Sequence, residues 1–243
     1  MHPIAVALIF LLGGLGGATA VPKLILDLCG GTGAWSRPYK DAGCDVYVVT
    51  LPDYDVTDVT ITHNSVTFHP QRSGIGPLRI PLVRIHGILA APPCDQFSLA
   101  NTRSTYRTTP NWSEGLVAVN ACLAIIQAAM AKGYMKFWAL ENPFGHLRKF
   151  LGVPGYTFEA WWFDADVPFV KRTDLWGYYT RPVATVTDKP ARLTNSARDS
   201  SRNTKGWYAP EVPAEYAHLA LDRKAVRAIT PRGFAQAFWK ANK

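Results

Sequence analysis

The residue best suited to chemistry is a cysteine near the middle of the chain. An apolar run over residues 85–91 ends at Pro92 and Pro93, and Cys94 follows directly. Proline cannot donate to a sheet ladder, so this pattern predicts a strand that stops there and presents the cysteine at its end. A free cysteine is more often a small buried hydrophobe than a nucleophile. Cys94 is therefore a candidate nucleophile whose assignment depends on its neighbours.

An acidic residue follows a second expected strand. Residues 136–140 are mostly apolar, and Glu141 and Asn142 come directly after them, before Pro143. The carboxyl ends of parallel strands meet at one edge of a sheet, and α/β enzymes keep their chemistry at that edge. We therefore expect Glu141 on the same edge as Cys94.

A glycine-rich turn follows the first expected strand, residues 23–28, and leads into a helix expected over residues 34–42. Glycine permits positive φ and lets backbone N–H groups approach a ligand, and Asp27 at the strand end can hold a cation or a polar group. The pattern is that of a nucleotide-type β-α unit, although a simple tight turn explains it equally well. The residues concerned are Asp27, Leu28, Gly30, Gly31 and Gly33.

Further acids follow the second strand, expected over residues 44–50, in an acidic loop at residues 51–58. Asp53 and Asp55 are placed there to accept ribose hydroxyls or an adenine amino group, as carboxylates do in dinucleotide-binding folds. Loop acids are more often simply solvated. Both assignments therefore depend on the rest of the site.

The remaining pattern predicts an α/β domain around these strands. Apolar residues recur at helical spacing after Ser113, which is expected to cap a helix that runs to about residue 132. Residues 60–84 have the composition of an inserted hairpin, and residues 99–111 that of a mobile loop beside the cysteine. Further elements are expected at residues 146–151 (helix), 157–163 (strand) and 231–242 (helix).

Composition narrows the class of protein. The 243 residues allow one sizeable α/β domain with a full core. The 26 Lys and Arg residues against 18 Asp and Glu give a formal net charge of +8, which favours a polyanionic partner such as nucleic acid. The four cysteines are widely spaced with no C-x-x-C pair. Neither a zinc site nor a disulfide framework is indicated, and the usage suits a reducing cytosol.

Residues 1–22 form a separate apolar segment. Residues 4–20 are uncharged, contain several glycines and end in an Ala-Thr-Ala pattern that is similar to a signal-peptide cleavage site. No Lys or Arg precedes the run, and it is shorter than the roughly 20 apolar residues that a spanning helix needs. A signal, an anchor, and an upstream start codon with the functional protein beginning near Val21 all remain open.

Taken in order, the four strand-end motifs resemble those of the DNA (cytosine-5)-methyltransferases. The resemblance covers residues 24–177 and a C-terminal tail, and its most specific part is the Pro-Cys pair followed by Phe97 and Ser98. Residues 27–33 match the family's first S-adenosylmethionine motif, 55–57 its adenine-contacting acidic motif, 93–98 its nucleophile motif and 141–142 its Glu-Asn motif.

The resemblance implies a Rossmann-like S-adenosylmethionine-dependent methyltransferase sheet flanked by helices, with a small basic appendage. It implies methyl transfer from S-adenosylmethionine to C5 of cytosine in DNA, with Cys94 attacking C6 and Glu141 contacting N3. The target cytosine would be flipped out of the duplex, and the loop at residues 99–111 would close over it. A cytoplasmic monomer that needs no metal is expected. The implied cofactor contacts are Asp27, Leu28, Gly30, Gly31, Gly33, Asp53, Asp55 and Pro92.

The sequence departs from the family's pattern at three points. Cys29 stands where the first motif usually has an aromatic residue, and Thr50 where the second strand usually ends in an acid. The family's Gln-x-Arg-x-Arg motif is not intact. Asp53 is the candidate to replace the missing acid, and Lys171 or Arg172 to replace the missing arginine; the catalytic role is assigned to Arg172.

The expected organisation is a catalytic domain over residues 23–177, a basic segment over residues 178–226 and a C-terminal helix, 227–243, that returns to the catalytic domain. The basic segment is short for target recognition in this family, so a short or relaxed target sequence is expected. Two other functions remain open: an RNA cytosine methyltransferase, and a degenerate nucleic-acid-binding module of the same fold.

Overall fold

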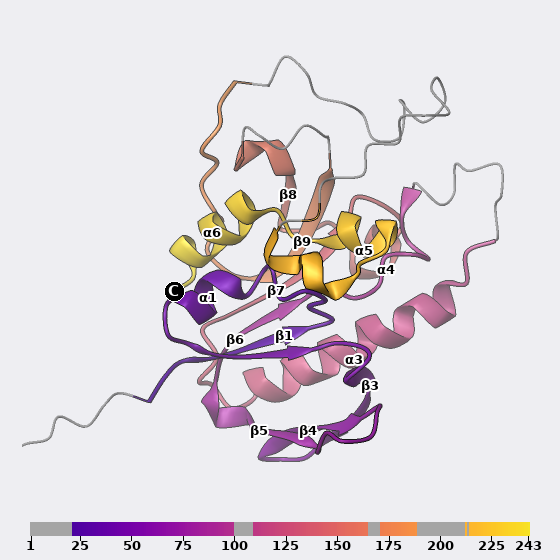
Figure 1. The fold of residues 1–243 in the computed structure, drawn as a ribbon, viewed down its shortest axis with the longest axis vertical. Coiled ribbons are helices and arrows are strands. Elements are labelled where there is room, and N and C mark those ends of the chain that lie inside the picture. Colours follow the sequence, from indigo (N-terminus) through magenta and orange to yellow (C-terminus); the bar gives the residue numbers. More distant parts are fainter. Residues whose placement is uncertain (1–20, 100–108, 165–170, 189–211, 213) are drawn as a thin grey trace, which may run out of the picture.

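A six-stranded sheet in the order β2-β1-β6-β7-β9-β8 organises the chain. The computed structural model describes residues 21–99, 109–164, 171–188, 212 and 214–243 (Figure 1). The first four strands of that order are parallel, whereas β9 is antiparallel to both of its neighbours. The fold is therefore α/β with a mixed sheet. The strands are β1 Leu24–Leu28, β2 Asp45–Val49, β6 Ile85–Ala90, β7 Phe137–Pro143, β8 Tyr156–Glu159 and β9 Arg172–Tyr178.

Helices cover both faces of this sheet, with α1 and α6 on one face and α3 on the other (Figure 1). Strand β1 shows why: Leu24 and Leu26 enter the core beneath α3, whereas Ile25 enters the core beneath α1 and α6. Such alternation makes a central strand apolar at every position. The helices are α1 Arg37–Asp41, α3 Trp112–Met130, α4 Arg148–Leu151, α5 Arg223–Ala228 and α6 Arg232–Ala241, with 3-10 turns η1 Leu82–Arg84, η2 Ala160–Trp162 and η4 Ala214–Leu219.

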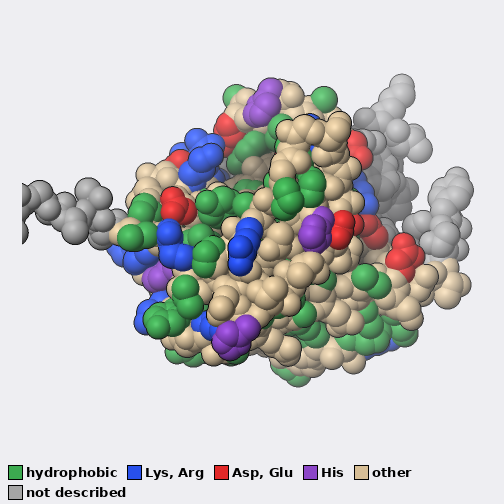
Figure 2. Space-filling view, turned by 90° about the horizontal axis from the view of Figure 1, so that it is seen from below, with side chains coloured by type: hydrophobic (Ala, Val, Ile, Leu, Met, Phe, Trp, Pro, Cys, Tyr) green, Lys and Arg blue, Asp and Glu red, His purple; other side chains and the backbone are tan. Residues whose placement is uncertain are grey.

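A second, three-stranded antiparallel sheet packs below α3. Its strands are β3 Tyr54–Ile61, β4 Ser65–Pro70 and β5 Leu78–Pro81. The segment expected to form a hairpin thus contributes to a three-stranded sheet. The prediction of an acidic loop is wrong from Tyr54 onwards, because Val56 is buried in the core beneath α3 and the segment forms strand β3. Figure 2 views the molecule from this side and shows, among the described side chains, basic and acidic groups dispersed over the face and no continuous basic patch.

Three helix or strand boundaries differ from those that the sequence predicted. The first helix begins at Arg37 instead of residue 34, because the chain from Cys29 to Gly33 uses positive φ and continues in turns to Ser36. Helix α3 is capped by Asn111, whose side chain accepts from the Glu114 N–H, and the prediction of Ser113 was wrong. The strand expected to reach residue 163 ends at Glu159 and continues as η2.

By length and composition, α3 is apolar enough to cross a membrane. Val119, Cys122, Ile125, Ile126 and Ala129 are nevertheless buried along one side of it, and they belong to the same core as β1 and β6. The apolar character of α3 is accounted for by packing between two sheets.

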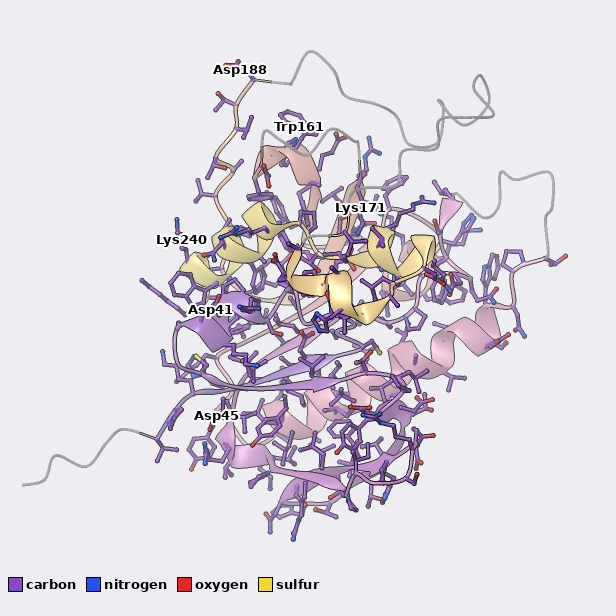
Figure 3. All side chains as sticks on the ribbon, in the orientation of Figure 1. Asp41, Asp45, Trp161, Lys171, Asp188 and Lys240 are labelled. Carbon is purple, nitrogen blue, oxygen red and sulfur yellow. The ribbon has the colours of Figure 1, made fainter. Side chains whose placement is uncertain are left out.

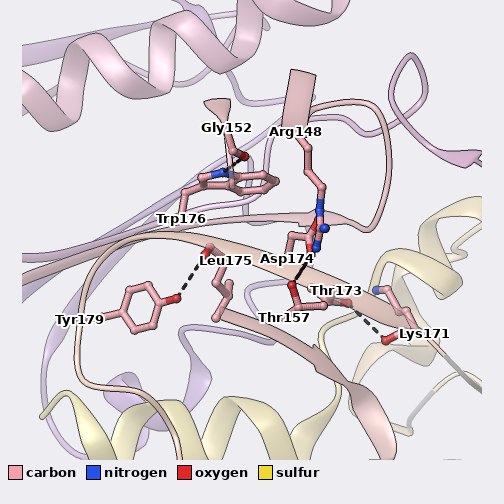
Figure 4. Close-up of polar contacts among 9 residues, drawn as sticks. All are labelled: Arg148, Gly152, Thr157, Lys171, Thr173, Asp174, Leu175, Trp176 and Tyr179. Atoms are coloured by element: carbon pink, nitrogen blue, oxygen red, sulfur yellow. Dashed lines mark hydrogen bonds and ion pairs between the residues drawn. The ribbon is translucent and has the colours of Figure 1, made fainter. Parts of the chain in front are cut away.

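A buried ion pair joins α4 to strands β8 and β9 (Figure 4). Arg148 Nε and Nη2 donate to the two oxygens of Asp174 at 2.6 and 2.5 Å, and Thr157 Oγ1 donates to Asp174 Oδ1 at 2.7 Å. The Asp174 side chain is 0% exposed and that of Arg148 32%. A carboxylate so deeply buried keeps its charge only through such bidentate pairing.

Replacing Arg148 by Met is expected to lower the free energy of unfolding by about 3 kcal/mol, because the Asp174 charge would remain buried without its cation. Guanidinium denaturation measures this. The control is Arg37→Met, which removes an ion pair with Asp41 that is more than half exposed on both sides, and it should change stability little. Equal effects of the two substitutions would show that the Arg148–Asp174 pair has no special structural role.

Candidate functional site

The strand order of the sheet reverses between β1 and β6, which is the position at which open α/β folds have their binding crevice. The chain leaves β1 for β2 on one side and later returns to pair β6 with the other side of β1. At such a switch in strand order the loops after the two central strands diverge, and open α/β sheets bind ligands there. The glycine turn follows β1 and the Pro-Pro-Cys segment follows β6, so the two strongest sequence motifs flank this crevice.

A buried amide joins the Pro-Pro-Cys segment to the Glu-Asn segment. Asn142 Nδ2 donates to the Pro92 carbonyl at 3.0 Å, and both residues are buried. Further along, the His146 N–H donates to the Phe97 carbonyl at 2.8 Å. Gly145 is required there, since a Cβ at that position would lie 2.2 Å from the Phe97 oxygen. These contacts fix the chain on both sides of Cys94 against the end of β7.

Cys94 is half-buried and lies within electrostatic range of Glu141, as the motif spacing predicted. Burial raises the pKa of its thiol, and the negative charges of Glu141 and Asp95 raise it further. The ammonium group of Lys171 acts in the opposite direction. Burial and the surrounding charges together therefore set how much thiolate is present, with burial the largest influence.

Glu141 sits in β7 opposite Leu175 of β9. Burial raises its pKa, while Lys171 lowers it and Asp174 raises it. Glu141, Lys171, Thr173 and Thr230 line one small pocket together with Phe158, Ala160, Pro231 and Phe234. Lys171 lies where β9 begins, beside α5 (Figure 3), and its Nζ donates to the Arg227 carbonyl at 3.2 Å.

The structure brings Lys171, and not Arg172, to Glu141 and Cys94. Side chains alternate along a strand, so Lys171 and Thr173 face the pocket while Arg172 points to the opposite side. The exposed Arg172 guanidinium lies over the Phe144 ring, 4.6 Å from its centroid. Of the two predicted alternatives for the catalytic cation, Lys171 therefore lies beside Glu141, whereas Arg172 lies away from it.

The turn after β1 has the backbone shape that its glycines predicted. Cys29, Gly31 and Gly33 have φ of 55°, 56° and 72°. A Cβ on Gly31 would meet nothing within 4 Å, so the turn presents backbone to an open space. Leu28 is fully buried beneath it.

Asp27 supports this turn from below. Its side chain is completely buried, its Oδ2 accepts from Ser36 Oγ at 2.5 Å, and its Oδ1 has no hydrogen-bond partner among the described residues. A Cβ on Gly30 would lie 2.4 Å from the Asp27 carboxyl carbon, so glycine is required over it. Burial, opposed by the Ser36 hydrogen bond, raises the pKa of Asp27 to about 7.

The two other predicted acids lie on the adjacent segment after β2. Asp53 forms an ion pair with Arg72 at 2.6 Å. Asp55 Oδ1 accepts from the backbone N–H and the hydroxyl of Thr57 at 2.8 and 2.7 Å. Asp55 is therefore oriented by its own strand, and Asp53 by the loop that follows β4.

The sequence did not reveal that η4 and α5 also contribute to the crevice. Tyr216 of η4 is buried, and Thr32 of the glycine turn is among the groups that influence the pKa of its hydroxyl. Lys224 of α5 pairs with Asp95, Nζ to Oδ2, at 2.7 Å. These contacts join residues far apart in the chain, and no local pattern predicts them.

No protein-family model matches this chain, and neither does any curated protein. Within the part of the chain that the structure describes, no cluster of three or more His, Cys, Asp or Glu side chains could hold a metal ion.

We expect Asp27→Asn to remove a pH dependence of stability. The folded-state pKa of Asp27, about 7, lies above its ordinary value of 3.8. The unfolded chain therefore loses this proton first, and the contribution of Asp27 to stability is lost as pH rises from about 4 through about 7. Denaturation at a series of pH values should show a smaller fall for Asp27→Asn. Exposed Asp58, replaced by Asn as the control, should leave the wild-type profile; identical profiles for all three proteins would contradict the assignment.

Proposed function

We propose that this protein transfers a methyl group from S-adenosylmethionine to C5 of cytosine in DNA, with Cys94 as the covalent nucleophile. The observation that carries the proposal is the placement of Cys94 and Glu141, within electrostatic range of each other, at the adjacent ends of β6 and β7. The resemblance of the four motifs to the DNA (cytosine-5)-methyltransferases supports the same reaction.

The reaction needs a nucleophile and an acid on opposite atoms of one ring. C5 of cytosine reacts poorly until a thiolate adds to C6. This addition places negative charge on the ring, and an acid that donates a proton to N3 neutralises that charge. When bound, S-adenosylmethionine supplies the methyl group as a sulfonium. After C5 has gained the methyl group, a base removes the C5 proton, the Cys94–C6 bond breaks and the thiolate leaves. Cys94 and Glu141 are the groups proposed for the addition step, and water is the proposed base for the elimination.

The ionisation of Glu141 and Cys94 is coupled. A charged Glu141 raises the pKa of the thiol, so protonation of Glu141 favours the thiolate. Burial raises the pKa of Glu141 and favours its protonated form, which can donate to N3. Lys171 stabilises negative charge on either residue. Burial is the largest influence on the thiol and favours its neutral form, so protonation of Glu141 and the charge of Lys171 both act against the effect of burial.

The residues of the crevice fit the proposed cofactor. The backbone of the glycine turn faces open space at Gly31, and Asp27 beneath it has a buried oxygen that lacks a partner among the described residues. Asp53 and Asp55 follow β2, where carboxylates accept ribose hydroxyls or an adenine amino group. Pro92 lies just after β6, on the other side of the proposed cofactor site from these acids. These groups would hold the nucleoside.

DNA is the acceptor that the motif resemblance implies, and the net charge of +8 suits a polyanionic acceptor. In a duplex, the target cytosine would have to be extruded before Cys94 could reach it. Residues 100–108 of the loop expected to close over the cytosine, and residues 189–211 and 213 of the basic segment, lie outside the described residues. Methyl transfer from labelled cofactor to DNA and to RNA, run side by side, separates the DNA enzyme from an RNA enzyme and from a binding module without turnover.

We expect wild-type protein to form a denaturation-resistant complex with a duplex that contains 5-fluorocytosine, in the presence of S-adenosylmethionine. Fluorine on C5 cannot be removed as a cation, so elimination fails and the Cys94–C6 bond persists. Cys94→Ala should form no such complex, whereas Cys44→Ala, at another half-buried cysteine, should form it. Denaturing electrophoresis reads the result. A complex that survives Cys94→Ala would exclude Cys94 as the nucleophile.

Titration calorimetry should place S-adenosylmethionine at the glycine turn. The double variant Gly31→Val, Asp55→Ala is expected to bind at least about tenfold more weakly, a loss of about 1.4 kcal/mol, because a side chain enters the open space and an acceptor is lost. The matched control is Gly43→Val, Asp58→Ala. Gly43 also has positive φ, 84°, and open space around its Cβ position. Similar affinities for the two double variants would show that the cofactor does not bind at the glycine turn.

A further inference from the structure

Helix α5 is attached at two points near Cys94, to Asp95 and to Lys171. At its start, Lys224 Nζ pairs with Asp95 Oδ2 at 2.7 Å. Near its end, the Arg227 carbonyl accepts from Lys171 Nζ at 3.2 Å. The helix is capped by Asp222, whose side chain accepts from the Ala225 N–H, and Val226 is buried beneath it. One short helix therefore contacts the residue after Cys94 and the cation beside Glu141.

Four charged groups lie within electrostatic range of Cys94. Glu141 comes from β7, Lys171 from the start of β9, Asp95 from the same loop and Lys224 from α5. Glu141 can be neutralised by the proton that the reaction requires. Asp95 is different, since it directly follows Cys94 in the chain and its carboxylate therefore stays close to the thiol. The charge of Asp95, unless it is offset, opposes the thiolate at every stage.

We infer that Lys224 is a positioning residue for Cys94: by holding Asp95 in an ion pair, it offsets the carboxylate charge beside the thiol and favours the thiolate. The inference rests on the proposed function only in taking Cys94 as the nucleophile. Lys224 need not touch the substrate, because it acts through Asp95.

Exposure sets the size of the effect. The Lys224 side chain is 70% exposed and that of Asp95 40%, so solvent and salt screen the pair. Removal of the Lys224 charge is therefore expected to raise the pKa of Cys94 by about 0.5, which lowers the thiolate fraction about threefold at neutral pH.

The test measures the Cys94 thiol in the full-length protein, with neither DNA nor cofactor added. Iodoacetamide reacts with the thiolate, so its rate across a neutral-to-alkaline pH series, followed on the Cys94 peptide by mass spectrometry, gives the pKa. The ultraviolet absorbance of the thiolate, as a difference from the matching Cys94→Ala protein, gives the same pKa if the reagent reaches the thiol slowly. Lys224→Met should raise the pKa and slow alkylation about threefold at neutral pH, and Asp95→Asn should lower the pKa.

The double variant and a matched control decide the mechanism. In the Asp95→Asn background, Lys224→Met should have a clearly smaller effect than in wild type, because the charge that Lys224 offsets is gone. Arg227→Met removes a charge of the same sign from the same helix, and should leave the pKa of Cys94 near its wild-type value. An unchanged pKa in Lys224→Met, an equal shift in the Asp95→Asn background, or an equal shift in Arg227→Met would each overturn the inference.

The two proposals fail in distinguishable ways. If the pKa shifts as expected but no complex forms with 5-fluorocytosine DNA, the electrostatic role of Lys224 stands and the proposed reaction does not. If the complex forms and the pKa of Cys94 is the same in Lys224→Met, the reaction stands and Lys224 has no role in it.

Discussion

The hydrogen bond from the Asn142 amide to the Pro92 carbonyl is the contact on which the candidate site depends. Strands β6 and β7 pair only as far as Ala90 and Leu140, and Pro92 has no N–H with which to continue a ladder. The buried Asn142 side chain replaces the missing backbone contact. Because Cys94 follows Pro92 by two residues and Glu141 immediately precedes Asn142, this one bond holds the two proposed reactive groups on the same edge.

Two acids in the sheet show how the surroundings shift the pKa of a carboxyl group. Asp27 has the hydroxyl of Ser36 as a hydrogen-bond donor, and burial raises its pKa to about 7. Burial also raises the pKa of Glu141, and the charge of Lys171 opposes that rise. A carboxyl group whose pKa is shifted by burial and by a specific charge partner is a candidate for proton exchange during a reaction.

The sequence was sufficient to predict the strand ends that carry the motifs, because proline and glycine stop parallel strands at recognisable places. It was not sufficient to distinguish Lys171 from Arg172. That choice depends on which face of the sheet each side chain at the start of β9 occupies. The sequence does not specify this, because it does not show that β9 pairs antiparallel with β7 or in which register. Asp55 was expected in a loop and lies in β3, since its neighbour Val56 is buried by α3. The contact of Lys224 with Asp95 joins positions 129 residues apart and is purely tertiary.

The packing of α6 on α1 also has a consequence for how the fold is assembled. The Tyr39 hydroxyl donates a hydrogen bond to the carbonyl of Asn242, 203 residues away in the sequence. Trp35 packs edge-on against Phe238. Loop-closure entropy opposes contacts of such separation until most other contacts have formed. The aromatic side chains on the α1 face of the sheet are thus shielded from solvent only after the C-terminal part of the chain has docked on them.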